Sequence, residues 1–100
     1  MKKFMVIDTC EREIGHPYFF DTMEKAQIHL FNLFLEACRH LDADDYNKYV
    51  VTTKEELEKA INSLIDNDIF DDENNFEGTY AWTETTNHDN WDGKIFEIEI

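Results

Sequence analysis

Residues 21–41, DTMEKAQIHLFNLFLEACRHL, carry the strongest structural pattern in this chain of 100 residues. Asp21 is a favourable N-cap, and Glu24 three residues later completes a capping-box-like pair. Apolar side chains then recur every three or four residues until about His40, which predicts a long amphipathic helix. The line that faces the core, with the positions beside it, consists of Met23, Gln27, Leu30, Phe34, Cys38 and Leu41, with Ala26, Leu33 and Ala37.

The apolar arc of this helix is wider than one sheet contact needs. Ile28, Phe31 and Leu35 extend it on the other side. Exposed apolar area of this size is covered either by another part of the chain or by a partner. We favour a second helix of the same chain, because the sequence offers one further on.

The N-terminal residues predict a hairpin. Residues 3–9 read as a strand with apolar side chains on both faces, which suits an interior strand of a sheet. Residues 11–15 look like a turn, and residues 18–20, which follow Pro17, read as a short second strand. We expect these two strands to pair.

The middle of the chain predicts one more strand and one more helix. Residues 46–51 alternate between polar and apolar side chains in the manner of a strand. Thr53 and Glu56 then form a Thr-x-x-Glu capping box, which opens a helix that runs through about Ile65. Asn67 is a plausible C-terminal stop for this helix.

The last third begins with an acidic connection over residues 66–78, which ends at Gly78. Residues 79–86 alternate as a strand. Residues 87–93 look like a loop that ends in an Asp-Gly turn, and residues 94–100 alternate as a closing strand.

These elements give the order β-β-α-β-α-β-β. The sequence therefore predicts an α+β fold, with residues 1–100 as a single domain. We expect an antiparallel-rich sheet with the two helices packed on one face.

Charge is the outlying property of the composition. The chain has 23 Asp and Glu against 9 Lys and Arg, a net charge of −14. Residues 1–41 hold six acids and five bases, whereas residues 42–100 hold 17 acids and four bases. DNA, RNA and anionic membranes are polyanions, so this balance argues against direct binding to any of them.

The acids gather in two clusters. The first candidate site residues are Asp66, Asp68, Asp71, Asp72, Glu73 and Glu77, and the second are Asp42, Asp44 and Asp45. Either cluster alone is commonly just a solvated surface. The two together, with the uneven distribution of charge, favour a shaped negative face.

Nucleophilic catalysis finds no support in the sequence. Cys38 lies in the apolar line of the first helix and reads as a buried, inert thiol. Cys10 and His16 form no recognised pair. Two cysteines without a secretory signal suggest reduced thiols in a cytoplasm. We expect no enzyme activity.

Metal and cofactor motifs are also weak. Cys38 and His40 have no second pair of zinc ligands. Asp66 begins a calcium-loop pattern, but Phe70 stands at the third ligand position and Asp71 stands where the loop needs glycine. Loose cation binding stays open. We expect no metal site and no cofactor.

Carboxylates near aromatic side chains suit a protein interface. Carboxylates accept a bidentate arginine as phosphate groups do. Phe70, Phe76 and Trp91 lie close to the acids and could serve as apolar anchors. Core packing is the favoured reading for Phe70 and Phe76, whereas Trp91 in a polar loop is an equally good candidate for partner contact.

The chain resembles small acidic proteins of phages and mobile elements. The opening MKKFMVIDT, residues 1–9, and the strand-to-helix passage FDTMEKA, residues 20–26, are similar to small phage proteins. So is a composition rich in Ile, Asn, Lys and Phe and poor in Ala, Gly and Pro. These proteins include anti-CRISPR and anti-restriction inhibitors, several of which mimic DNA. The resemblance concerns the whole chain and transfers no individual site residue.

This resemblance and the charge lead to one expected function. We expect a cytoplasmic inhibitor that binds the basic surface of a nucleic-acid-binding enzyme, foremost a CRISPR nuclease, and blocks its DNA site by mimicry. The resemblance to phage proteins implies that this cytoplasm is that of a bacterial host cell. The two acidic clusters and Trp91 would make the contacts.

Two other classes stay open. A regulatory adaptor or a homodimer could use the apolar flank of the first helix, around Ile28, Phe31 and Leu35. A small enzyme or metal protein is the third class.

Overall fold

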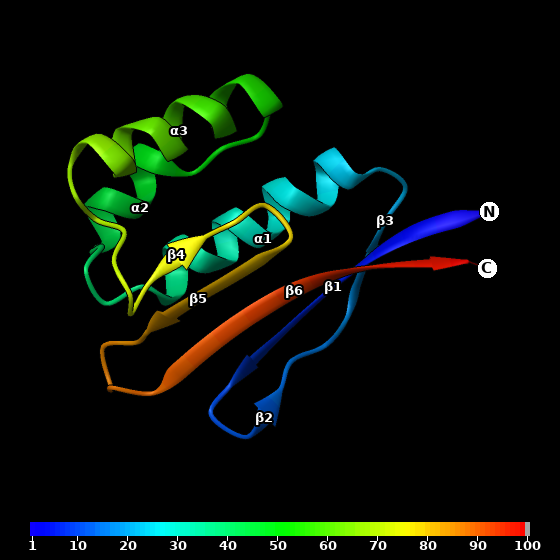
Figure 1. Ribbon diagram of the computed structural model, residues 1–100, viewed down its shortest axis with the longest axis horizontal. Helices are drawn as coiled ribbons and strands as arrows, with labels where there is room; N and C mark the ends of the chain where they lie inside the picture. Colours follow the sequence, from blue (N-terminus) through cyan, green and yellow to red (C-terminus); the bar gives the residue numbers. More distant parts are fainter. Residues whose placement is uncertain (100) are drawn as a thin grey trace.

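The computed structural model describes residues 1–99. The elements in chain order are β1 (Lys2–Cys10), β2 (Glu13–Ile14), β3 (Tyr18–Phe20), α1 (Met23–Ala37), α2 (Ala43–Tyr49), α3 (Lys54–Asp66), β4 (Asn75–Phe76), β5 (Tyr80–Glu84) and β6 (Asn90–Glu99) (Figure 1). The α+β class is therefore confirmed. The expected order and the expected number of helices are wrong, because three helices follow one another between two groups of three strands.

The strands form one antiparallel sheet in the order β2-β1-β6-β5-β4, with β3 also paired to β1. The expected hairpin is present, because Phe4 lies opposite Phe20 and Val6 opposite Tyr18. On its other side β1 pairs along its whole length with β6, from Lys2 with Glu99 to Cys10 with Trp91. Residues 3–9 are thus part of an interior strand, as their two apolar faces predict.

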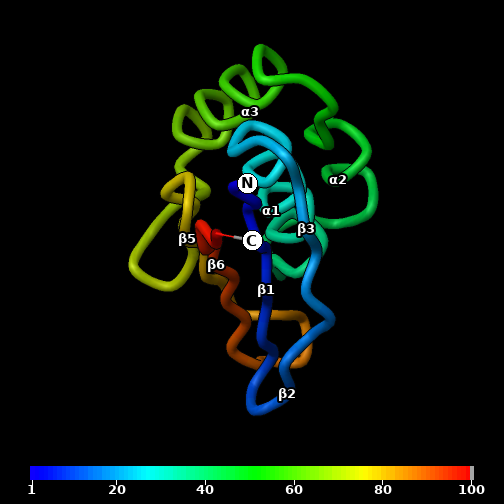
Figure 2. Tube along the Cα trace, turned by 90° about the vertical axis from the view of Figure 1, so that its right-hand side faces the viewer, coloured from blue at the N-terminus to red at the C-terminus, as the bar shows by residue number. Residues whose placement is uncertain are grey.

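The helices lie in two layers on one side of the sheet. Helix α1 packs on β1, β5 and β6, and both α2 and α3 contact α1 (Figures 1 and 2). As a result Phe31 is 0% and Leu35 is 1% exposed. The apolar flank of α1 is covered within the chain, by two helices rather than by one.

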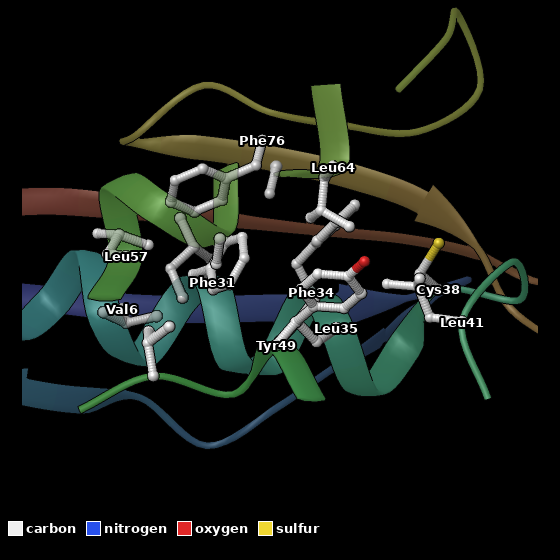
Figure 3. Packing of buried hydrophobic residues seen from close by; sticks show 14 of the residues in the cluster. Val6, Phe31, Phe34, Leu35, Cys38, Leu41, Tyr49, Leu57, Leu64 and Phe76 are labelled. Atoms are coloured by element: carbon white, nitrogen blue, oxygen red, sulfur yellow. The ribbon is translucent and has the colours of Figure 1, made fainter. Parts of the chain in front are cut away.

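The core lies between the sheet and these helices (Figure 3). Phe34, which is 0% exposed, lies at its centre. Its ring is 6.0 Å from the ring of Phe70, 6.4 Å from that of Trp91 and 6.5 Å from that of Phe31, measured between centroids. No helix within residues 1–99 is both long and apolar enough to cross a membrane.

Helix α2 replaces the strand expected at residues 46–51. The Asp42 side chain accepts a hydrogen bond from the Asp45 amide at 2.9 Å, and the Asp45 side chain accepts one from the Asp42 amide at 3.2 Å. This reciprocal cap starts a short helix whose Tyr46 and Tyr49 lie three residues apart and pack against the core. Local capping therefore overrides the alternating pattern.

The two longer helices follow the prediction more closely. Helix α3 begins after the Thr53 capping box and ends at Asn67, as expected. Helix α1 is shorter than expected, because it ends at Ala37. Its N-cap is Thr22, whose side chain accepts from the Lys25 amide, while the Asp21 carboxylate pairs instead with Lys3.

The predicted loop over residues 87–93 is correct for residues 87–89 only, because β6 begins at Asn90. Gly93 is part of this strand, opposite Asp8 and Ala81, and makes no turn. A Cβ at Gly93 would lie 2.6 Å from Leu30 Cδ1, so glycine here permits the close approach of α1 to the sheet. The closing strand was expected to reach Ile100, which lies outside the described residues.

Replacing Gly93 by alanine should therefore destabilise the fold. We expect a loss of about 1–3 kcal/mol in the free energy of unfolding, because the added methyl group overpacks the core. Denaturant unfolding measures this loss. Glu97→Ala, an exposed change in the same strand, is the control and should stay within about 0.5 kcal/mol of wild type.

A double-mutant cycle tests whether contact with Leu30 causes the destabilisation by Gly93→Ala. Leu30→Val removes the contacting Cδ1 atom, so Gly93→Ala should cost less in that background than in wild type. Equal costs in both backgrounds would contradict the packing explanation.

His29 gives the fold a pH dependence of its own. Its ring lies 4.4 Å from the Tyr18 ring and 5.1 Å from the Phe20 ring, and its buried Nε2 has no hydrogen-bond partner among the described residues. Burial lowers the pKa of His29, against a smaller opposing effect of Asp8. The fold therefore favours neutral His29.

The sign of this effect follows from linkage. Because the folded-state pKa lies below the unfolded value of about 6.5, the contribution of His29 is complete above that pH and is lost as the pH falls through the folded value. His29→Gln should therefore lose less stability than wild type between pH 7.5 and pH 5.5. Thermal unfolding at both values tests this, with the exposed His16→Gln as control, and equal losses in all three proteins would contradict it.

Candidate functional site

Eight of the nine predicted acidic site residues lie at one end of the molecule. The start of α2, the end of α3 and the connection to β4 are together at this end (Figure 1). We call it the acidic end: Asp42, Asp44, Asp45, Asp66, Asp68, Asp71, Asp72 and Glu73. Glu77 is separate. It follows β4 and borders a hollow formed with Gln27 and Lys54.

No carboxylate of the acidic end forms an ion pair with a described residue. The ion pairs within residues 1–99 involve other acids, namely Glu99, Glu97, Asp21 and Glu84. The negative charges of the acidic end are therefore not neutralised by ion pairs with described basic side chains. Its charge is available to a partner.

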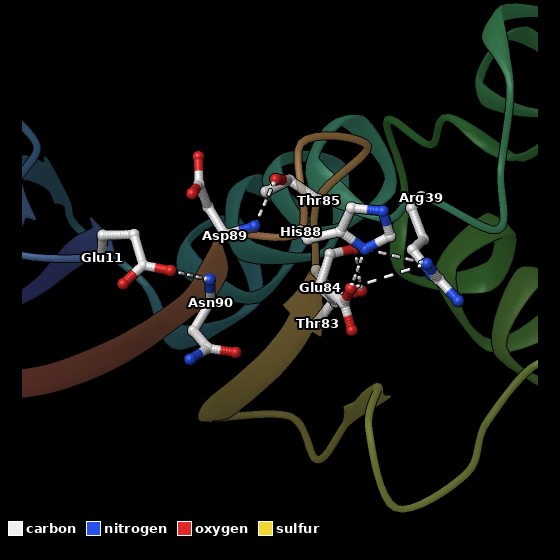
Figure 4. Close-up of polar contacts among 8 residues, drawn as sticks. All are labelled: Glu11, Arg39, Thr83, Glu84, Thr85, His88, Asp89 and Asn90. Atoms are coloured by element: carbon white, nitrogen blue, oxygen red, sulfur yellow. Dashed lines mark hydrogen bonds and ion pairs between the residues drawn. The ribbon is translucent and has the colours of Figure 1, made fainter.

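Glu84 at the end of β5 lies in a polar cluster with Arg39 and His88 (Figure 4). Arg39 Nη1 lies 3.5 Å from Glu84 Oε1 and 3.2 Å from His88 Nδ1, and His88 Nδ1 also contacts Glu84 Oε1. The hydrogen bond with His88, and next the charge of Arg39, lower the pKa of Glu84. Arg39 and Glu84 therefore form a local ion pair within this cluster.

Asp71 fixes the shape of the acidic connection. Its Oδ1 accepts hydrogen bonds from the Glu73 amide at 2.8 Å, the Asn74 amide at 3.0 Å and Asn74 Nδ2 at 2.9 Å. The Asp71 amide also donates to the Asn74 carbonyl. Asp71 is thus a structural residue of this turn, whereas Asp72 and Glu73 remain exposed beside it.

The same connection is attached to the core on two sides. The half-buried Phe70 packs against Phe34, and Trp82 Nε1 donates to the Asp72 carbonyl at 3.2 Å. The Asn67 side chain donates to the Ser63 carbonyl at 2.8 Å and thereby closes α3. The carboxylates are therefore presented by a held segment.

The three aromatic candidates turn out to be core residues to different degrees. Phe76 and Trp91 are buried and Phe70 is half-buried, so core packing is the correct reading for the two phenylalanines. Trp91, expected in a polar loop, is 5% exposed in β6, and its Nε1 donates to Asp8 at 2.9 Å. Its ring therefore packs mainly in the core and offers little surface to a partner.

The structure reveals a second surface that the sequence reasoning did not single out. Side chains alternate across a strand, and Val6 and Gly93 face α1. Their neighbours therefore lie on the opposite, open face. We define this open face by Met5, Ile7, Thr9, Phe19, Tyr80, Trp82, Asp92, Lys94, Phe96 and Ile98.

The open face is apolar at one end. Met5 lies between Phe19 and Phe96, which are 54% and 43% exposed. Contiguous exposed apolar side chains of this kind are typical of interaction surfaces. The sequence indicated this apolar surface in part, because Met5 and Ile7 make the second face of β1 apolar. That pattern alone also fits a strand that is covered on both sides.

The other end of the open face carries a hollow of about 390 Å³. It is lined by Tyr80 and Trp82, whose ring centroids are 5.2 Å apart, and by the carboxylate-bearing residues Glu11, Glu73 and Asp92. Glu73 belongs to the acidic end as well. The hollow and the acidic end are therefore neighbours on one continuous surface.

Asp92 is held in the hollow by its neighbours. Thr9 Oγ1 donates to Asp92 Oδ1, and the Tyr80 hydroxyl donates to Asp92 Oδ2 at 3.4 Å. Burial, followed by the charge of Asp92, raises the pKa of Tyr80, so the phenol stays protonated as a donor. Lys94 Nζ lies 5.1 Å from the centroid of the Tyr80 ring.

Neither cysteine has the surroundings of an activated nucleophile. Burial and the surrounding carboxylates, Asp89 first among them, raise the pKa of the Cys10 thiol and so disfavour the thiolate. Cys38 is buried. Within residues 1–99 no group of three or more His, Cys, Asp or Glu side chains is arranged to hold a metal ion.

No protein-family model, no curated protein and no solved structure matches this chain at a significant level. Its surface chemistry is therefore the basis for assigning a function.

The role of Asp71 in the acidic connection can be tested directly. Asp71→Ala should speed amide hydrogen exchange at Glu73 and Asn74 by about tenfold, since it removes the acceptor of both amides. Asp72→Ala removes the same charge from the neighbouring position and should leave these two rates nearly unchanged. Similar rates in both variants would show that the turn does not depend on Asp71.

Proposed function

We propose that this protein is a non-enzymatic inhibitor that occupies the cationic nucleic-acid site of a bacterial defence nuclease, with a CRISPR nuclease as the leading candidate. One observation carries the proposal: eight carboxylates lie at one end of a folded domain, and no described base neutralises them. A nuclease channel offers lysine and arginine side chains that ordinarily pair with phosphate groups. Carboxylates on a firm scaffold compete for the same cations.

The scaffold supports this mimicry because it limits the entropy lost on binding. The reciprocal cap holds Asp42 and Asp45, and the Asp71 turn holds the segment that bears Asp72 and Glu73. Preordered groups lose less conformational freedom on binding than a disordered acidic tail does. Electrostatic attraction then gives fast association that weakens as salt is added.

The open face supports a protein partner over free nucleic acid. Protein interfaces combine apolar contacts at their centre with polar groups at the rim. Phe19, Met5 and Phe96 supply the first kind of contact, and the neighbouring acidic end supplies the second. The net charge of −14 repels a free polyanion.

Self-association through the open face is the second candidate function, favoured by the exposure of Phe19 and Phe96. It replaces the adaptor or homodimer that was expected to use the flank of α1, because Phe31 and Leu35 are buried in the chain. Sedimentation of the purified protein distinguishes a dimer from a monomer that binds another protein.

Neutralising the acidic end should abolish binding while leaving the fold intact. The variant is Asp66→Asn/Asp68→Asn/Asp72→Asn. Asp66 lies at the C-terminal end of α3, where the helix dipole disfavours a carboxylate, and Asp68 has φ of 55°, which asparagine also tolerates. We therefore expect an unchanged or higher melting temperature.

The matched control is Glu24→Gln/Glu55→Gln/Glu58→Gln, which removes the same charge from exposed positions on α1 and α3. Each protein is used to capture binding proteins from bacterial lysate at low and high salt, and captured nucleases are then tested in competition with duplex DNA. Wild type and control should retain a nuclease at low salt and displace its DNA. The acidic-end variant should do neither, and equal displacement by both variants would refute the proposal.

A further inference from the structure

We infer that the hollow on the open face receives an arginine side chain of the protein partner. This inference rests on the proposed function and names the chemistry of one contact within it. The lining combines the aromatic pair Tyr80 and Trp82 with the carboxylates of Glu11, Glu73 and Asp92. At about 390 Å³ the hollow is larger than a single side-chain head group requires.

The lining selects a cation. Within the described residues none of these three carboxylates forms an ion pair. Two of them already accept neutral donors, since the Asn90 amide donates to Glu11 and the Tyr80 hydroxyl donates to Asp92. An anionic ligand such as a nucleotide would bring its charge beside three others of the same sign.

The aromatic side chains favour a planar cation over a compact one. Lys94 lies over the Tyr80 ring, whereas no described cation lies over the Trp82 ring. Trp82 is further held by the hydrogen bond from its Nε1 to the Asp72 carbonyl. A guanidinium group stacks on an indole face and also offers paired donors to a carboxylate, which an ammonium group cannot do with the same geometry.

The position of the hollow links it to the acidic end. Glu73 lines the hollow, and the preceding Asp72 is joined to Trp82 through its carbonyl. A partner drawn in by the acidic end would therefore meet an arginine pocket at its border. The general charge attracts the partner, and the pocket fixes how it docks.

The experiment is a titration of the whole protein with N-acetyl-arginine amide, followed by the NMR signals of the Trp82 indole N–H and of the Ala26 backbone amide. Trp82 lines the hollow, whereas Ala26 of α1 is buried in the core outside the lining, so Ala26 serves as internal reference for the fold. The Trp82 signal should shift in a saturable way while the Ala26 signal stays in place. N-acetyl-citrulline amide, a neutral molecule of similar shape, should cause little shift, and N-acetyl-lysine amide should bind several-fold more weakly than the arginine ligand.

Variants locate the binding groups. Glu73→Gln/Asp92→Asn keeps the shapes and one acceptor oxygen of each group but removes two charges, and should weaken arginine binding about fivefold. Glu55→Gln/Glu58→Gln removes the same charge from exposed positions on α3 and should bind as wild type does. An unchanged Ala26 amide signal verifies that each variant is folded.

Each outcome of these measurements either supports or overturns the inference. No saturable Trp82 shift, equal binding of arginine and citrulline ligands, tighter binding of the lysine ligand, or equal effects of the two variants would overturn the inference. The proposed function is decided separately by the competition with DNA. Arginine binding without nuclease inhibition would refute the function alone, and inhibition without arginine binding would refute the pocket alone.

Discussion

The burial of α1 on both sides is the constraint on which the rest of the structure depends. Phe34 is surrounded by Phe31 of the same helix, Trp91 of the sheet and Phe70 of the acidic connection. Removing a ring of this size from a core typically costs about 3–5 kcal/mol, a large part of the stability of a small domain. The same contact that stabilises the core also fixes the acidic connection, so the charged surface and the fold are coupled through one side chain.

The acidic end works against the stability of the fold that presents it. Asp66 ends α3 at the negative pole of the helix dipole, and Asp68 takes a backbone conformation with φ of 55°. Repulsion between neighbouring carboxylates adds to both costs, since screening by salt acts only beyond about 8 Å. No described base forms an ion pair with these carboxylates. A surface that keeps such costs is better explained by binding than by solubility, which interspersed lysines would also provide.

Sequence predicts the elements that local chemistry determines. The Thr53 capping box and the Asn67 stop gave the correct limits of α3, and the two apolar faces of residues 3–9 gave an interior strand. The sequence-based predictions failed where a tertiary contact or a competing local signal determines the structure. Gly93 reads as a turn residue until Leu30 is known to lie against it, and Trp91 reads as a loop residue until β6 is paired with Cys10 of β1.

The acidic clusters were recognisable as a candidate site, but their convergence depends on the chain path through α2, which the alternating pattern of residues 46–51 concealed. The open face could not be found at all without strand register, since Phe19, Met5 and Phe96 come from three distant segments.

Under the proposed function, the two surfaces would have different physical roles in recognising a partner. Attraction between many exposed charges is long-ranged and tolerant of geometry, so it raises the association rate for any strongly cationic cleft. Discrimination between such clefts needs short-range contacts that a wrong partner leaves unsatisfied. The open face offers these contacts in two forms, the apolar row around Met5 and the aromatic hollow around Trp82. Both lie on the sheet, where the strand register sets the spacing of their side chains. The acids lie on helix ends and a turn, and small displacements of a carboxylate there change its long-range attraction to a partner only slightly. The arrangement thus puts the geometrically demanding groups on the most rigid part of the fold and the tolerant charges at its edge.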